Sequence, residues 1–247
     1  MTTSVYTVAL LALVTALATG LGALPFAFVH DVSRRYLGLA NALAAGLMLA
    51  ASLLLLYEGG LQGVLLVALG AVLGGVFIAF SRRLLKRRDD LHVGSLRDAD
   101  ATKALLIVGV MTVHSVTEGM GVGVAYGGGE GLGVFITTAI VLHNVPEGLA
   151  ISLVLVPRGT PVWQAAAWSV FSSLPQPLLA VPAYLAVEAF TPFLPVGLGF
   201  AAGAMIWMAF RELLPEALED ASRPSVAGVA LVATVGMLLV QFLLKGG

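Results

Sequence analysis

Long runs of apolar residues, separated by short polar connectors, form the main pattern along the chain. The runs predict eight helices, which we place at about 4–29, 36–57, 61–84, 102–126, 131–156, 162–188, 194–214 and 225–244. Each run is long enough to cross a hydrocarbon core of about 30 Å. Only the connector at about 85–101 is polar for any length. The pattern therefore predicts an all-α, polytopic membrane protein with a single transmembrane domain over residues 1–247.

Composition agrees with this class and narrows the chemistry. The chain is 59% hydrophobic and 11% charged, as is typical of polytopic membrane proteins. No basic surface for nucleic acid is present, so we expect membrane lipid and no nucleic acid among the partners. The chain has no cysteine, which excludes disulfides and thiolate metal sites. Any metal site must therefore use nitrogen and oxygen ligands.

Basic residues are concentrated in alternate connectors. The connectors after the first, third, fifth and seventh predicted helices contain Arg34, Arg35, Arg82, Arg83, Lys86, Arg87, Arg88, Arg97, Lys103, Arg158 and Arg223. The connectors after the second, fourth and sixth helices contain none. By the positive-inside rule, the odd-numbered connectors are cytoplasmic and both termini lie outside.

Two similar motifs carry the candidate chemistry: H-S-V-T-E-G at 114–119 and H-N-V-P-E-G at 143–148. In each motif the His and Glu are four residues apart, so they share one face of a helix. Imidazole and carboxylate groups bind divalent transition metals, and ionisable groups inside a membrane are costly unless paired or metal-bound. The motifs therefore predict one intramembrane metal site with four ligands: His114, Glu118, His143 and Glu147. The alternative is that each pair only forms hydrogen bonds across a helix interface.

Prolines and small residues mark further features of the predicted helices. Pro25 is expected to tighten or kink the end of the first helix. S-S-L-P-Q-P at 172–177 must depart from an ideal helix, which makes Gln176 a further ligand or pathway residue, with a simple hinge as the alternative. The small-residue spacing of some glycines predicts close contacts between helices; these are Gly38, Gly46, Gly70, Gly74 and Gly203.

Together with A-T-G-L-G-A-L-P in the first helix and A-G-A-M-I-W-M-A-F-R-E-L-L-P-E-A in the seventh, these motifs resemble the ZIP (Zrt/Irt-like) metal transporters. The similarity is greatest to the short GufA-like bacterial branch and covers essentially the whole chain. It implies uptake of a divalent metal, typically zinc, toward the cytoplasm. It also implies eight helices in a three-two-three bundle, extracellular termini, a bacterial inner-membrane location and frequently a homodimer.

The resemblance also implies roles for individual residues. His114, Glu118, His143 and Glu147 match the family's first metal site, and the two glutamates would bridge to a second site that Asn144 joins. Relatives usually have a better ligand where Ser115 stands and commonly a Glu where Gln176 stands. We therefore expect one well-formed site, with the second weak or absent.

The seventh helix departs from the family as well. Arg211 precedes Glu212 where many relatives have His-Glu, and a guanidinium cannot bind a metal. We expect Arg211 to pair with Glu212 or Glu216, to take the place of a missing cation electrostatically, or to extend to the cytoplasmic interface. Glu212 remains a weaker ligand candidate, as do Ser115 and Gln176.

The main hypothesis is transport, without enzymatic activity. Zinc is the first candidate substrate, and iron, manganese, cadmium and cobalt are others, because affinity order alone does not set selectivity. One alternative is an intramembrane metal-dependent hydrolase that activates water with the same ligands. The chain lacks an H-E-x-x-H signature, which counts against that reading. A second alternative is a metal sensor that binds metal and does not transport it.

Overall fold

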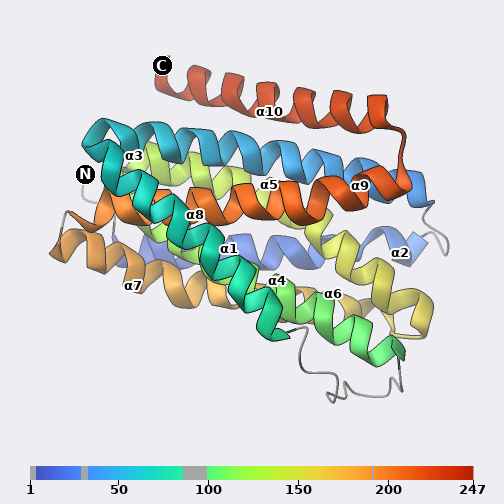
Figure 1. Ribbon diagram of the computed structural model, residues 1–247. Helices are drawn as coiled ribbons and strands as arrows, with labels where there is room; N and C mark the ends of the chain where they lie inside the picture. The colour runs from blue at the N-terminus through green and yellow to red at the C-terminus, as the bar shows by residue number, and fades with distance from the viewer. Residues whose placement is uncertain (1–3, 29–32, 86–98, 191, 247) are drawn as a thin grey trace.

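The computed structural model describes residues 4–28, 33–85, 99–190 and 192–246, and in these ranges the chain is helical, with no strand (Figure 1). The elements are α1 (Val5–Leu21), α2 (Pro25–Phe28), α3 (Arg34–Leu85), α4 (Ala99–Gly128), α5 (Glu130–Leu155), η1 (Val156–Arg158), α6 (Val162–Ser173), α7 (Pro175–Ala189), α8 (Phe193–Met208), η2 (Ala209–Leu213), α9 (Leu214–Asp220) and α10 (Arg223–Gly246). The predicted connector at 85–101 lies largely outside the described residues.

In the described part of the chain, six helical stretches are long and apolar enough to cross a membrane. They are Val5–Phe28, Arg34–Ser81, Glu130–Ser152, Val162–Ala189, Phe193–Asp220 and Arg223–Val240. The prediction of an all-α, polytopic membrane protein is confirmed at this level. The number of eight crossings and their three-two-three arrangement stay predictions.

α3 joins two of the predicted helices. Its backbone leaves the helical conformation at Gly63 (φ 172°, ψ 98°), and Figure 1 shows the chain turning back there, so that α3 has two arms. The connector was predicted as E-G-G-L-Q-G at 58–63, and the break falls at its last residue. Every glycine in this stretch weakens the helix. A Cβ atom on Gly59 would meet Val67, whereas Gly60 and Gly63 both have more room, so free space alone does not single out Gly63.

Two other predicted helices are interrupted at prolines, as expected. α1 ends at Leu21 and α2 begins at Pro25, and α6 ends at Ser173 before α7 begins at Pro175. Proline is favourable at the first position of a helix and unfavourable inside one. The continuous helices predicted at 4–29 and 162–188 were therefore wrong in detail, whereas the predicted departures at Pro25 and Pro175 are confirmed.

Close contacts between helices occur at the glycines that the sequence pattern singled out. A Cβ atom on Gly74 would lie 2.0 Å from the Phe200 carbonyl oxygen, and one on Gly203 would lie 2.0 Å from the Ala71 carbonyl oxygen. The second arm of α3 and α8 therefore touch through their backbones, as small residues permit. A Cβ atom on Gly38 would lie 2.9 Å from the Ala217 carbonyl oxygen of α9, and one on Gly46 would lie 2.4 Å from the Ala230 carbonyl oxygen of α10.

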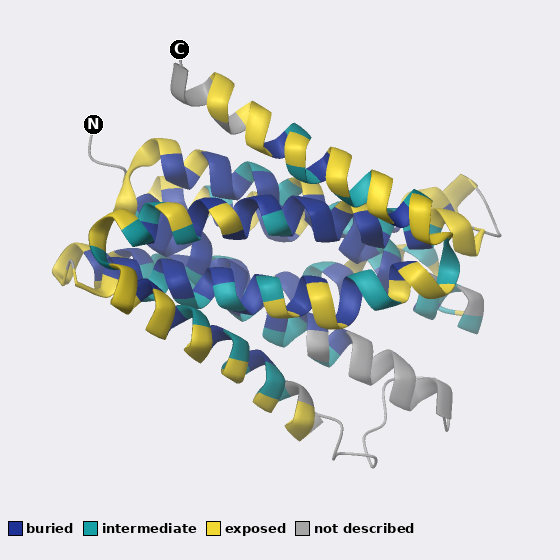
Figure 2. Ribbon diagram, turned by 45° about the horizontal axis from the view of Figure 1, so that its top comes forward, coloured by how far each residue is buried: buried dark blue, intermediate teal, exposed yellow. Residues whose placement is uncertain are grey.

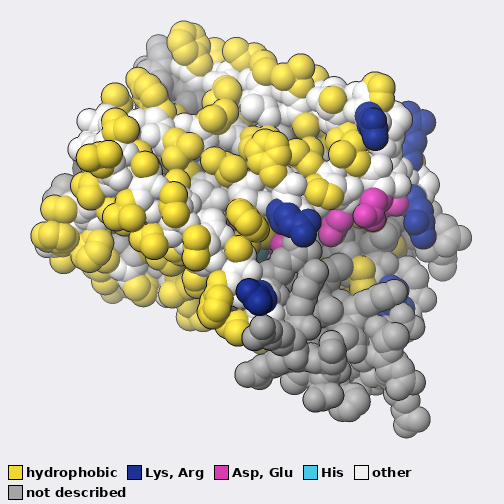
Figure 3. Space-filling model, in the orientation of Figure 1, with side chains coloured by type: hydrophobic (Ala, Val, Ile, Leu, Met, Phe, Trp, Pro, Cys, Tyr) yellow, Lys and Arg dark blue, Asp and Glu magenta, His cyan; other side chains and the backbone are white. Residues whose placement is uncertain are grey.

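α4 and α5 occupy the centre of the bundle. α4 packs against α5, α6, α7 and α8, and α5 packs against α1, α3, α4 and α6. Figure 2 shows that α10, which leads to the C-terminus, is exposed along most of its length, whereas the helices in the middle are buried. Hydrophobic side chains cover most of the face drawn in Figure 3, and Lys and Arg gather toward one end. This surface suits a lipid environment.

Candidate metal site

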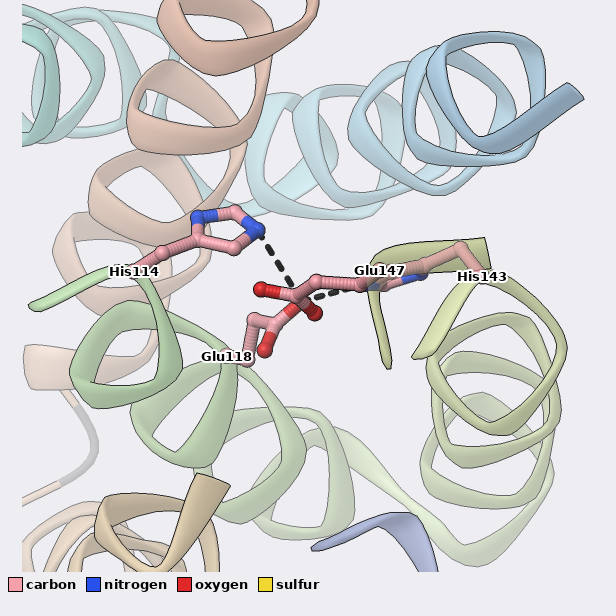
Figure 4. A group of neighbouring side chains, drawn as sticks. All are labelled: His114, Glu118, His143 and Glu147. Carbon is pink, nitrogen blue, oxygen red and sulfur yellow. Dashed lines mark hydrogen bonds and ion pairs between the residues drawn. The ribbon is translucent and has the colours of Figure 1, made fainter. Parts of the chain in front are cut away.

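The site lies between the two central helices. α4 supplies His114 and Glu118, and α5 supplies His143 and Glu147. Within each pair the residues are one helical turn apart, and all four side chains are at most 5% exposed. Each offers one ligand atom, and these atoms lie within 4.8 Å of one another. Figure 4 shows the four side chains pointing toward one another from the two helices.

Glu118 is at the centre of this group. Its Oε1 lies 3.1 Å from Nε2 of His114 and also contacts Nε2 of His143. Its other oxygen, Oε2, accepts a hydrogen bond of 2.7 Å from Nε2 of Gln176 on α7. One carboxylate oxygen therefore faces two imidazole rings, while the second is held by an amide.

The orientation of His143 is fixed by a hydrogen bond on the other side of its ring. Nδ1 lies 3.0 Å from the carbonyl oxygen of Ala139, which can only accept, so Nδ1 carries a proton there. In a neutral ring, Nε2 then presents a lone pair to Oε1 of Glu118. Two acceptors in contact require a proton or a metal ion between them. The geometry therefore defines a position for a cation.

Glu147 points into the same group without a hydrogen-bond donor. The residue is 5% exposed, and neither Oε1 nor Oε2 has a hydrogen-bond partner in the described structure. A buried carboxylate without a donor is costly. A dication coordinated by Glu118 and Glu147 would offset both negative charges and remove this cost.

Zinc fits the size of the group after a small contraction. Two ligand atoms that are each about 2 Å from a zinc ion lie at most about 4 Å apart. The present limit of 4.8 Å therefore requires movements of less than about 1 Å. Two nitrogens and two carboxylate oxygens form a ligand set that zinc accepts, and the same set suits other divalent transition metals.

The predicted second-site residues are held in a chain of amides. Nδ2 of Asn144 donates to the Thr15 carbonyl oxygen at 2.7 Å and to Oε1 of Gln176 at 3.2 Å. Nε2 of Gln176 in turn donates a hydrogen bond to Oε2 of Glu118. Oδ1 of Asn144 and Oγ of Ser115 are buried without a hydrogen-bond partner among the described residues. We call the path from Thr15 through Asn144 and Gln176 to Glu118 the amide chain.

Glu212 approaches the group from a different helix. It lies in η2, a π-helical turn, is 7% exposed, and is near enough to His114 for an electrostatic interaction. π-turns are often found at functional sites because the wider turn redirects side chains. Arg211 beside it is exposed. No described acidic residue forms an ion pair with Arg211, so of the alternatives predicted for this residue its exposure agrees with extension away from the bundle.

The last glycine of each motif has a role that the sequence analysis did not predict. A Cβ atom on Gly119 would lie 2.6 Å from the carbonyl oxygen of Gln176, and one on Gly148 would lie 1.7 Å from that of Thr19. These glycines let α7 approach α4 and let α1 approach α5. The signal was present, since a glycine follows the glutamate in both motifs.

Comparisons with known proteins point in one direction. Residues 81–244 match the family described as ZIP Zinc transporter. Zinc transporter GufA of Myxococcus xanthus is 33% identical over 213 residues, which cover 81% of this chain and 84% of GufA. Zinc transporter ZIPB of Bordetella bronchiseptica is 32% identical over 245 residues, covering 92% of this chain and 76% of ZIPB.

A plant relative is longer than this chain. A protein of Arabidopsis thaliana is 47% identical over 237 residues, which cover 95% of this chain. The same region covers 38% of the plant protein, so this chain spans well under two thirds of that relative's length.

Proposed function

Because the chain belongs to the ZIP zinc transporter family and is GufA-like within it, we propose that it carries divalent metal ions across a membrane. Zinc is the first proposed substrate. The proposed direction is toward the cytoplasm. The proposed binding site consists of His114, Glu118, His143 and Glu147. Iron, manganese, cadmium and cobalt are further candidate substrates, because the same ligand types accept them.

The observation that carries the proposal is the position of Glu118 Oε1. It faces Nε2 atoms of two buried histidines, and Glu147 lies beside it without a donor. This arrangement is satisfied by a bound dication. Nitrogen and carboxylate ligands replace most of the ion's hydration shell. The hydrolase alternative is set aside, because the relatives are named transporters and the chain is not an enzyme.

The path to the cytoplasm is proposed to run past Glu212. This residue is buried, is near enough to His114 for an electrostatic interaction and lies on a different helix from the four ligands. A carboxylate at this point can receive the ion as it leaves the histidines. Alternate opening of the site to the two sides then completes transport.

The finer architecture is also part of the proposal. If the two arms of α3 each cross the membrane and α4 crosses once, the chain has eight crossings in the three-two-three arrangement of the family. The charge pattern favours both termini outside, in a bacterial inner membrane. A homodimer is the expected assembly.

Zinc flux into sealed proteoliposomes tests the proposed site. We expect the double variant His143→Ala with Glu147→Ala to reduce the initial rate on the order of 100-fold, because half of the ligands are lost. Glu130→Ala, an exposed acid on the same helix, is the matched control and should retain the wild-type rate. Unchanged flux in the double variant would refute the proposal. Zinc binding to the wild type without any flux would identify a sensor.

A second experiment tests whether Gln176 keeps the site to one metal. The amide donates to Glu118 where a carboxylate would bind a second ion. We expect purified wild type to bind one zinc ion per chain and Gln176→Glu to bind two, as measured by elemental analysis after gel filtration. Gln62→Glu, at an exposed position of α3, should leave the number at one. Two ions in the wild type would contradict this role of Gln176.

A further inference from the structure

A groove runs along the lipid-facing surface between the second arm of α3 and α8. Its volume is about 570 Å³. Gly75 and Gly203 form its floor, because they have no side chains, while Val76 lines one side and Trp207 and Phe210 line the other. Phe210 is 60% exposed and Val76 is 58% exposed, so the groove opens outward.

The two helices that form the groove run in the same direction. Gly70 approaches Val196, Gly74 approaches Phe200, and Gly75 faces Trp207, so the contacting residues increase together along both helices. The C-terminal ends of α8 and of the second arm of α3 therefore lie at the same end of the groove.

Positive charge marks that end. Arg211 lines the groove, is exposed, and forms no ion pair with a described acidic residue. Arg83 is also exposed and is seven residues after Val76, so it lies on the same face of α3 two turns further along. By the positive-inside rule, this end faces the cytoplasm.

We propose that this groove binds one anionic phospholipid of the cytoplasmic leaflet. An acyl chain lies on the glycine floor, and the phosphate interacts with Arg211 and Arg83. The rise from Val72 to Arg83 is about 16 Å, close to half of a hydrocarbon core of about 30 Å. Guanidinium groups bind phosphate oxygens in pairs, and basic pockets between helices on the cytoplasmic side bind acidic headgroups.

Native mass spectrometry of the purified protein with added lipid tests this site. We expect phosphatidylglycerol to bind about fivefold more tightly than phosphatidylcholine with the same acyl chains. Arg211→Ala should remove most of this preference. Gly75→Leu should weaken the binding of both lipids, because the leucine side chain would fill the floor of the groove. The variant should still fold, since a Cβ atom at this position meets no atom closer than 3.8 Å. Arg223→Ala, which removes an arginine outside the groove, is the matched control and should leave the affinities for both lipids unchanged.

Two results would overturn the proposal. Equal loss of preference in Arg211→Ala and Arg223→Ala would indicate diffuse attraction by all the arginines instead of a site. Occupation of the groove by a second copy of the chain is tested with Val76→Cys. The chain has no other cysteine, so any disulfide must form between two copies through this position. We expect no disulfide-linked dimer in native membranes, and efficient cross-linking would assign the groove to the second copy.

Discussion

Glu118→Gln is expected to abolish zinc transport. The carboxylate oxygen Oε1 faces both histidines of the site, and an amide there keeps the shape of the side chain but removes the negative charge. Without that charge, a dication is attracted mainly by Glu147, and both its binding and its desolvation become less favourable. We expect the initial rate of zinc flux in proteoliposomes to fall on the order of 100-fold.

The same substitution at an exposed acid provides the control. Glu130→Gln makes an identical chemical change on α5, outside the site, and should transport like the wild type. Gel filtration of both variants in detergent establishes that each is folded. A Glu118→Gln protein that is monodisperse and transports zinc within twofold of the wild-type rate would show that Glu118 does not bind the ion.

Gly148→Ala is expected to destabilise the protein and to disable transport with it. The added Cβ would lie 1.7 Å from the carbonyl oxygen of Thr19, so α1 and α5 must separate. That movement disturbs the hydrogen bond from Asn144 to Thr15 one helical turn away. Overpacking of this kind costs about 3 kcal/mol of the free energy of unfolding. Thermal denaturation followed by gel filtration measures the change.

Gly131→Ala is the matched variant for this experiment. It makes the same substitution on α5, and no atom lies within 4 Å of the new Cβ. We therefore expect its thermal midpoint to equal that of the wild type. Equal midpoints for Gly148→Ala and Gly131→Ala would mean that the contact between α1 and α5 does not limit stability.

The central pairs were predictable because their spacing is local. His and Glu four residues apart must share a helix face, and two copies on neighbouring helices suggested one shared site. The prolines at positions 25 and 175 were informative for the same reason, since proline acts on its own helix. The family assignment, which rested on these motifs, is confirmed.

Contacts between distant parts of the chain were much harder to predict. Asn144 donates to the backbone carbonyl of Thr15 in α1. Every residue has such a carbonyl group, so the sequence does not show which one accepts the hydrogen bond. Gln176 was suggested as a ligand, but its hydrogen bond to Glu118 depends on how α7 packs against α4. The predicted connector at 58–63 contains three glycines, at 59, 60 and 63, and composition alone did not show at which of them α3 breaks.

Among the described residues, several side-chain hydrogen bonds between helices fall into two groups, and this has a consequence for movement. The amide chain joins α1, α5, α7 and α4, and the hydrogen bond between the Thr19 and Ser173 hydroxyls joins α1 to α6. The bonds from Asn41 to Glu216 and from Thr234 to Gly46 join α3, α9 and α10. One large apolar cluster contains residues of both groups, including Ile140 of α5 and Met48 of α3.

Sliding one group along the other would break none of these bonds. The four proposed ligands all lie on helices of the first group, so they would move together. Glu212 lies in η2, which leads directly into α9 of the second group. If the two groups slide during transport, the distance between Glu212 and His114 should change as the ion moves from the histidines to Glu212. Distances within either group should stay constant.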